Sequence, residues 1–264
     1  MNNKTKKYLK LFTSFALVAA IAVGVTLAAL STITETKTNK FTSSKGITGE
    51  LTETEWKYDE DGWTDYLPGE STGKNPVITI ESKDEAGLNV AIAMKVVCLD
   101  NNGNEISLEK FQEKYGKVSY NGVDGINPAW TVDPTNPYMY YYNNTVAATK
   151  DGASTSPLFD TVTVLTGIQR VYGETTSTET IRVYTVDEDG NKTLKEEKTG
   201  QVLVNSTDKV YIVENGKEVE VTGDTTLPSF EIKVTGYATQ AENQNTTGAL
   251  SVADQTALKT LAGY

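Results

Sequence analysis

Residues 88–99, LNVAIAMKVVCL, carry an apolar side chain at every second position. Successive side chains of a strand point to opposite sides, so this spacing predicts a strand with one buried face. The residues of that face are Val90, Ile92, Met94, Val96 and Cys98. We expect the face to form part of the core of a β-sheet protein, with Cys98 as a small buried apolar side chain.

Shorter strand-like runs recur along the chain and are separated by residues that favour turns. Further strands are expected around residues 77–81, 139–142, 160–166, 180–186, 201–204, 209–213, 217–222 and 230–234. Asp189-Gly190 and Asn215-Gly216 lie between such runs, where a tight hairpin turn needs residues that tolerate positive φ. Two short helices are expected over residues 107–116 and 251–262, because apolar side chains recur there at helical spacing.

Many short strands with few helices predict an all-β fold. The architecture we expect is an antiparallel β-sandwich of the jelly-roll or Ig-like kind, with one or two short inserted helices. The chain has 264 residues, of which 38% are hydrophobic, and this is enough for a sizeable core. We expect residues 46–264 to form one β-sandwich domain that ends in a short helix.

The beginning of the chain has the pattern of a secretory signal peptide. Residues 1–10 contain four lysines and no acid, and residues 11–30 contain no charge at all. Small side chains near position 28 predict cleavage between Ala28 and Ala29, so residues 1–28 would be removed and the protein would be secreted. The apolar run is also long enough to cross a bilayer as a helix, which leaves a retained membrane anchor as the alternative.

The charge balance is strongly acidic. Removal of residues 1–28 would take away four lysines and no acidic residue, which changes the formal net charge from −11 to −15. Such a surface argues against a nucleic-acid partner, because phosphate neutralisation needs a basic face. It also opposes self-association until salt screens the repulsion.

Residues 29–45, which cleavage would leave at the N-terminus, alternate threonine with other residues. Threonine at every second position favours a strand, but the segment offers almost nothing to bury. The residues expected to take part in strand pairing are Thr32, Ile33, Thr34, Thr36, Thr38 and Phe41. Such a strand pairs only if another sheet supplies an edge, so the alternatives are an assembly strand and a flexible N-terminus.

The sequence has no histidine and a single cysteine, which excludes most catalytic and metal-binding arrangements. Nucleophile systems that depend on histidine lack their base, and zinc proteases of the HExxH kind lack their ligands. The acidic turn 187–191 departs from a calcium loop, because lysines occupy positions 6 and 12 of the pattern, at Lys192 and Lys198. We therefore expect no enzyme activity, no cofactor and no metal.

Four aromatic residues, Trp56, Tyr58, Trp63 and Tyr66, are interleaved with acidic residues. Aromatic rings beside carboxylates are what a surface-glycan platform would use, which makes these four candidate ligand aromatics. Two carboxylates could also support glycoside hydrolysis, but no pair stands out among 35 acidic residues. Packing in a core or an interface is the alternative role for such aromatic residues.

Five segments occur in an order that resembles a known family. They are residues 26–30 (TLAAL), Asn39–Thr42 (NKFT), the stretch 68–76 with Pro68, Gly69, Lys74 and Pro76, SPLFDTVTV at 156–164, and FEIKVTGYATQAEN at 230–243. In this order they resemble the TasA and camelysin family, secreted biofilm matrix proteins of Gram-positive bacteria whose signal peptides require the peptidase SipW. The insertion at 43–45 and the early position of Val77 depart from the family pattern.

The resemblance implies a jelly-roll or Ig-like sandwich and export to the cell surface or biofilm matrix. For fibre-forming members it implies donor-strand assembly, in which the N-terminal strand of one subunit fills a groove in the next. The metalloprotease label of camelysin does not carry over, because this chain has no histidine. We therefore expect a secreted structural protein of the extracellular matrix that self-associates into fibres or joins related subunits, and that meets a membrane only through an uncleaved signal segment. The alternative is a monomeric cell-surface adhesin that recognises a glycan or a host protein through residues 55–66.

Overall fold

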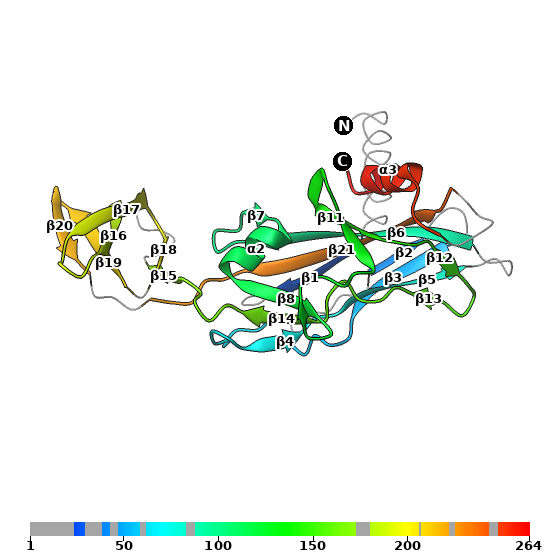
Figure 1. Cartoon of the computed structure of the whole chain (residues 1–264), viewed down its shortest axis with the longest axis horizontal. Helices are drawn as coiled ribbons and strands as arrows, with labels where there is room; N and C mark the ends of the chain where they lie inside the picture. The colour runs from blue at the N-terminus through cyan, green and yellow to red at the C-terminus, as the bar shows by residue number, and fades with distance from the viewer. Residues whose placement is uncertain are drawn as a thin grey trace, which may run out of the picture.

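The computed structural model shows an all-β fold with two short helices among the residues that it describes (Figure 1). The structure describes residues 24–29, 39–42, 47–58, 62–82, 88–172, 180–205, 207–221, 225–242 and 248–264. Its strands pair antiparallel and form a two-layered sandwich with a separate smaller lobe. The predicted antiparallel sandwich class is confirmed.

The first layer is built around the long strand β6, Leu88–Leu99. One edge of β6 pairs along most of its length with β21, Glu231–Gln240. The other edge is shared by β11 (Asn136–Tyr142), β12 (Val146–Ala148) and β7 (Glu105–Ile106). The outermost strands of this layer are β1 (Gly24–Ala29), beside β21, and β10 (Trp130–Asp133), beside β11.

The second layer consists of two ladders that join end to end. The strands of the first ladder, in spatial order, are β13 (Ala153–Ser154), β5 (Pro76–Ser82), β3 (Ile47–Glu53) and β2 (Asn39–Thr42). Those of the second are β4 (Ser71–Gly73), β14 (Thr161–Val164), β8 (Gly116–Tyr120) and β9 (Val123–Asp124). Backbone hydrogen bonds from Thr155, Leu158 and Lys74 to the facing segment continue the pairing from one ladder into the other.

The core lies between the two layers, as the alternation in residues 88–99 predicts. The five side chains of the predicted face, Val90, Ile92, Met94, Val96 and Cys98, are all fully buried. They meet side chains of β21 and of the second layer, including Ile232, Val234, Leu51, Ile78, Ile80 and Val162. Burying an aliphatic side chain of this size stabilises the fold by about 1.5–3 kcal/mol relative to leaving it in water.

The two expected helices are present and cover different parts of the sandwich. Helix α2, Leu108–Lys114, begins at the N-cap Ser107 and buries Phe111 in the main core. Helix α3, Val252–Leu261, begins with a capping box formed by Ser251 and Asp254. Its Leu258 packs on the outer face of the first layer, against the small side chains of β6 that point away from the core.

A smaller lobe projects from one end of the sandwich and is drawn in yellow tones in Figure 1. Its strands are β15 (Arg170–Tyr172), β16 (Thr180–Val186), β17 (Lys192–Thr199), β18 (Val202–Val204), β19 (Asp208–Glu214) and β20 (Lys217–Glu220). The lobe has its own hydrophobic cluster, which includes Ile181, Val183 and Val202. Asn215 and Gly216 both have positive φ in the hairpin between β19 and β20, as a type I′ turn requires. Within the described part of residues 46–264, expected as one sandwich domain, the lobe thus has a hydrophobic cluster of its own besides those of the sandwich.

Candidate functional site

The outer edge of β21 is the first candidate site, because among the described residues the strand that covers it is the segment around the expected cleavage position. Strand β1 pairs with it in register from Gly24 opposite Gly236 to Ala29 opposite Glu231. Strand β1 is the last strand of this sheet, while the other edge of β21 is held by β6. The outward-facing backbone N–H and C=O groups of Glu231–Gly236 are therefore satisfied by residues 24–29.

The expected cleavage bond lies inside this pairing. Ala28 is opposite Ile232, and Ala29 is opposite Glu231. If the chain is cut there, most of β1 leaves and the facing edge of β21 loses its partner. An uncovered edge strand presents a row of unpaired backbone groups that can pair with another extended segment. Residues 1–23, the remainder of the expected signal peptide, lie outside the described residues.

The expected assembly strand is described only at its two ends. Thr32, Ile33, Thr34, Thr36 and Thr38 lie outside the described residues. Phe41 belongs to β2, where it is opposite Gly49 of β3 at the edge of the second layer. Ala29, at the other end, belongs to β1 at the edge of the first layer. Ala29 and Phe41 therefore lie at the edges of different layers.

The candidate ligand aromatics lie in the core instead of forming an exposed platform. Trp56, Trp63 and Tyr66 are 7%, 7% and 4% exposed, and Tyr58 is half-buried. The ring of Tyr58 stacks on that of Trp63, with 5.6 Å between their centres. Burial raises the pKa of the Tyr66 hydroxyl, which donates a hydrogen bond to the backbone carbonyl of Pro228. These positions favour the alternative role, core packing.

An ion pair that sequence reasoning did not identify lies beside these aromatic rings. Lys74 Nζ is 2.7 Å from Glu53 Oε1, and both side chains are 0% exposed. The ammonium also lies 5.4 Å from the centre of the Trp56 ring. Burial lowers the pKa of Lys74, although the charge of Glu53 and its hydrogen bond act in the opposite direction. The sequence carries no signal for this pair, because lysine and glutamate are almost never fully buried.

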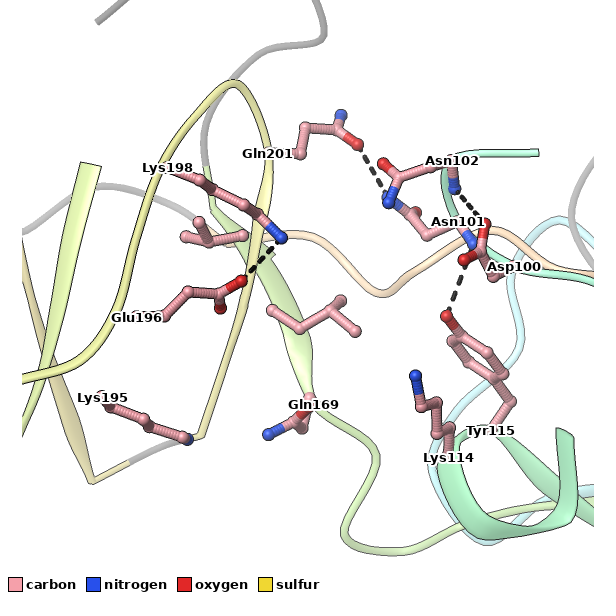
Figure 2. Close-up of a pocket in the computed structure, with 12 residues that line it drawn as sticks. Asp100, Asn101, Asn102, Lys114, Tyr115, Gln169, Lys195, Glu196, Lys198 and Gln201 are labelled. Atoms are coloured by element: carbon pink, nitrogen blue, oxygen red, sulfur yellow. Dashed lines mark hydrogen bonds and ion pairs between the residues drawn. The ribbon is translucent and has the colours of Figure 1, made fainter. Parts of the chain in front are cut away.

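A second candidate site is a polar cleft of about 320 Å³ between the sandwich and the lobe (Figure 2). The sandwich contributes residues of the turn after β6 and of the end of α2, and the lobe contributes β17, β18 and their connection. Figure 2 shows the side chain of Asn101 pointing across the cleft to Gln201, to which it donates a hydrogen bond of 2.7 Å. Residues about a hundred positions apart thus meet here, which no local pattern could predict.

The charges of this cleft are largely neutralised by neighbouring groups. Lys198 pairs with Glu196 at 2.8 Å, and Lys195 pairs with Asp208 at 2.7 Å. Asp100 Oδ1 accepts hydrogen bonds from backbone N–H groups of its own turn. What remains for a ligand is mainly amide groups, together with the ammonium of Lys114 and the hydroxyl of Tyr115.

The described residues were also compared with what a metal centre and a membrane-spanning helix require. Within the described ranges, no three acidic or cysteine side chains come together as metal ligands would. In that same part of the chain, no helix is both long enough and apolar enough to cross a bilayer. No family model, curated protein or solved structure matches this chain. The resemblance to the TasA and camelysin family therefore rests on the sequence segments alone.

Proposed function

We propose that this chain is a secreted structural protein of an extracellular, biofilm-type matrix, and that it assembles into fibres by exchange of its N-terminal strand. The observation that supports this function most directly is the pairing of β1 with β21, because the expected cleavage at Ala28–Ala29 removes the cover of that edge. Cleavage would at once produce an acceptor edge and a new N-terminal segment that is competent to form a strand.

The donor in this scheme is the threonine-alternating segment at residues 29–42. Its side chains contribute little apolar area, so pairing depends on the backbone ladder, in which each hydrogen bond contributes about 1 kcal/mol net. The acceptor is the edge of β21 at Glu231–Gly236 of a neighbouring subunit. An edge that accepts a strand from the next copy, and a segment that is donated to another, produce a head-to-tail chain of subunits.

The test compares the mature chain, residues 29–264, with a chain that begins at residue 41. We expect filaments by electron microscopy from the first protein and monomers from the second. A point variant, Thr34→Pro, removes one backbone donor from the proposed ladder and should also abolish filaments. Thr34→Val is its matched control, because valine keeps the strand propensity and the backbone N–H. Undiminished filaments from the chain that begins at residue 41 would contradict strand exchange.

The alternative function is that of a monomeric adhesin. The aromatic residues expected to form its glycan-binding surface include Trp56, Trp63 and Tyr66, and these three are buried. A glycan array with the mature protein distinguishes the two functions. A protein that stays monomeric at every salt concentration and binds a glycan saturably would favour the adhesin. N-terminal sequencing of the exported protein decides the remaining alternative, since an intact apolar leader would indicate a membrane-tethered domain.

A further inference from the structure

The buried contact between Lys74 and Glu53 places an amine and a carboxyl group together in the sandwich core, away from water. Glu53 is the last residue of β3, and Lys74 lies between β4 and β5, where the two ladders of the second layer join. The backbone N–H of Lys74 also donates to Asp160 across that junction. Both side chains are therefore held by strands on either side and cannot easily separate.

Two further buried atoms in this cluster have no hydrogen-bond partner among the residues that the structure describes. They are Glu53 Oε2, the oxygen that does not contact the lysine, and Trp56 Nε1. One is an acceptor and the other is a donor, and the Trp56 ring lies against the same ammonium. A buried ion pair with an unsatisfied oxygen is costly, because the desolvation of two charges is only partly offset by their attraction.

We propose that Lys74 and Glu53 react with each other in the folded protein and form an intramolecular amide cross-link between Nζ and Cδ. Transfer of a proton from the ammonium to Oε1 first gives a neutral amine beside a neutral acid. The nitrogen lone pair then attacks Cδ, and Oε2 takes up the electron pair of the carbonyl. The Cδ–Oε1 bond breaks as the carbonyl re-forms on Oε2.

The reaction is balanced without an oxidant, a reductant or a second reactant. Of the three protons on the ammonium, one stays on the amide nitrogen and two leave with Oε1 as a water molecule. Trp56 Nε1–H, a buried donor without a hydrogen-bond partner among the described residues, would have to turn toward Oε2 to stabilise the negative charge that develops there. Fixed contact between the reacting groups removes the entropic cost of bringing them together. The product also replaces two buried charges with one neutral amide, which relieves the cost of the ion pair.

The test is the mass of the purified, denatured mature protein by electrospray mass spectrometry. We expect the wild-type protein to be lighter than its sequence mass by one water molecule, and Lys74→Met to have its full sequence mass. Lys57→Met is the matched control, because Lys57 is a nearby exposed lysine, and it should still lose one water. A wild-type protein of full sequence mass would overturn the proposal, whether or not Lys74→Met folds.

Peptide mapping separates this cross-link from other ways of losing water, such as ring closure at an Asp-Gly sequence. Trypsin cannot cleave after an acylated lysine, so peptide 46–57 should be found joined to peptide 58–83 through Glu53 and Lys74. Free peptides 46–57 and 58–74 in full yield, or loss of water that persists in Lys74→Met, would contradict the proposal. This outcome is independent of fibre formation, so either hypothesis can fail without the other.

Discussion

Asn101 donates a hydrogen bond from its side-chain Nδ2 to Gln201 Oε1 at 2.7 Å, and this bond joins the sandwich to the lobe. The Oδ1 atom of the same side chain accepts from the backbone N–H of Ser229, on the segment that returns from the lobe to β21. The side-chain amide of Asn101 therefore holds both the lobe, through Gln201, and the segment that leads from the lobe to β21, through Ser229. This arrangement links the turn after the central strand to the position of the smaller lobe.

We expect Asn101→Ala to loosen the lobe while the sandwich stays folded. The substitution removes two hydrogen bonds that each contribute about 1 kcal/mol net, but it leaves the hydrophobic clusters of the sandwich and of the lobe intact. Small-angle X-ray scattering should show a broader distribution of intramolecular distances, and proteolysis in the connection at residues 221–230 should become faster. Asn102→Ala is the control, because Asn102 bonds in its turn through its backbone N–H. Identical scattering from both variants would rule out this role for Asn101.

Asp133 should make the attachment of α3 sensitive to acid. Its side chain is 3% exposed, lies 2.6 Å from Lys259 Nζ of α3, and accepts from the Tyr141 hydroxyl. Burial alone would raise the pKa of Asp133, but the hydrogen bonds from Lys259, Thr135 and Tyr141 outweigh it and hold the pKa well below its usual range. Because the folded-state pKa lies below the unfolded value of about 3.9, this stabilisation is complete above that pH and is lost as the pH falls below it.

The corresponding variant is Asp133→Asn, which should lower the free energy of unfolding at neutral pH by about 2 kcal/mol through the loss of charged hydrogen bonds. It should also show a weaker decrease in stability between pH 4 and pH 2 than the wild-type protein. Urea unfolding at several pH values measures both effects. Asp124→Asn is the surface control, because its partner Lys117 is 3.3 Å away and the Asp124 side chain is 73% exposed. If the free energy of unfolding of both variants depended equally on acid pH, the contact between Asp133 and Lys259 would not contribute to the acid sensitivity of the fold.

Substitution of Trp63 should lower the stability of the fold and should not affect ligand binding directly. Trp63 is buried between Tyr58 and Tyr66, so Trp63→Ala should lower the free energy of unfolding by about 3–5 kcal/mol. The control is Leu67→Ala, a nearby change at a side chain that is 58% exposed, for which we expect a change within about 0.5 kcal/mol. Chemical denaturation followed by circular dichroism measures both. A folded, fully stable Trp63→Ala protein that loses glycan binding would reverse this interpretation.

The fold could be predicted wherever a local pattern decides which face of a strand is buried. The alternation at Val90 to Cys98 and the residues Asn215-Gly216 each determine their structure from neighbouring positions. The lobe could not be separated from the sandwich, because alternation identifies strands but not the sheet that each strand joins. Strand β16 of the lobe buries alternate residues, Ile181 and Val183, as β5 of the sandwich also buries alternate residues. The contacts between distant segments distinguish the two strands.

The candidate sites were less accessible to sequence reasoning, for two different physical reasons. Trp56 and Trp63 stand among acidic residues that suggested a surface, yet their rings are buried in the core. In the sequence, Lys74 stands out only as part of the family-like stretch 68–76, since a charged residue is expected in water unless a distant partner such as Glu53 compensates its charge. A contact between residues far apart in the sequence produces no pattern among neighbouring residues from which it could be predicted.

The thiol of Cys98 should be unreactive toward thiol reagents in the folded protein. It is fully buried in β6, and burial raises the pKa of this thiol, so the reactive thiolate is strongly disfavoured. Ellman's reagent should therefore find almost no thiol under native conditions and one thiol per chain in denaturant. Rapid labelling of the native protein would show that this part of the core opens, and would contradict the packing described for β6.

Assembly of the mature protein should increase with salt, because its expected charge of −15 makes subunits repel one another. The Debye length shortens from about 30 Å at 0.01 M salt to about 3 Å at 1 M. The backbone hydrogen bonds of strand exchange are short-range and neutral, so screening removes the repulsion but leaves the ladder.

Light scattering should thus show monomers at low salt and large assemblies at high salt for residues 29–264. The chain that begins at residue 41 should stay monomeric in both conditions, because it keeps nearly the same acidic surface but lacks the donor segment. If both proteins associate equally as salt rises, the association comes from the screened surface and not from an exchanged strand.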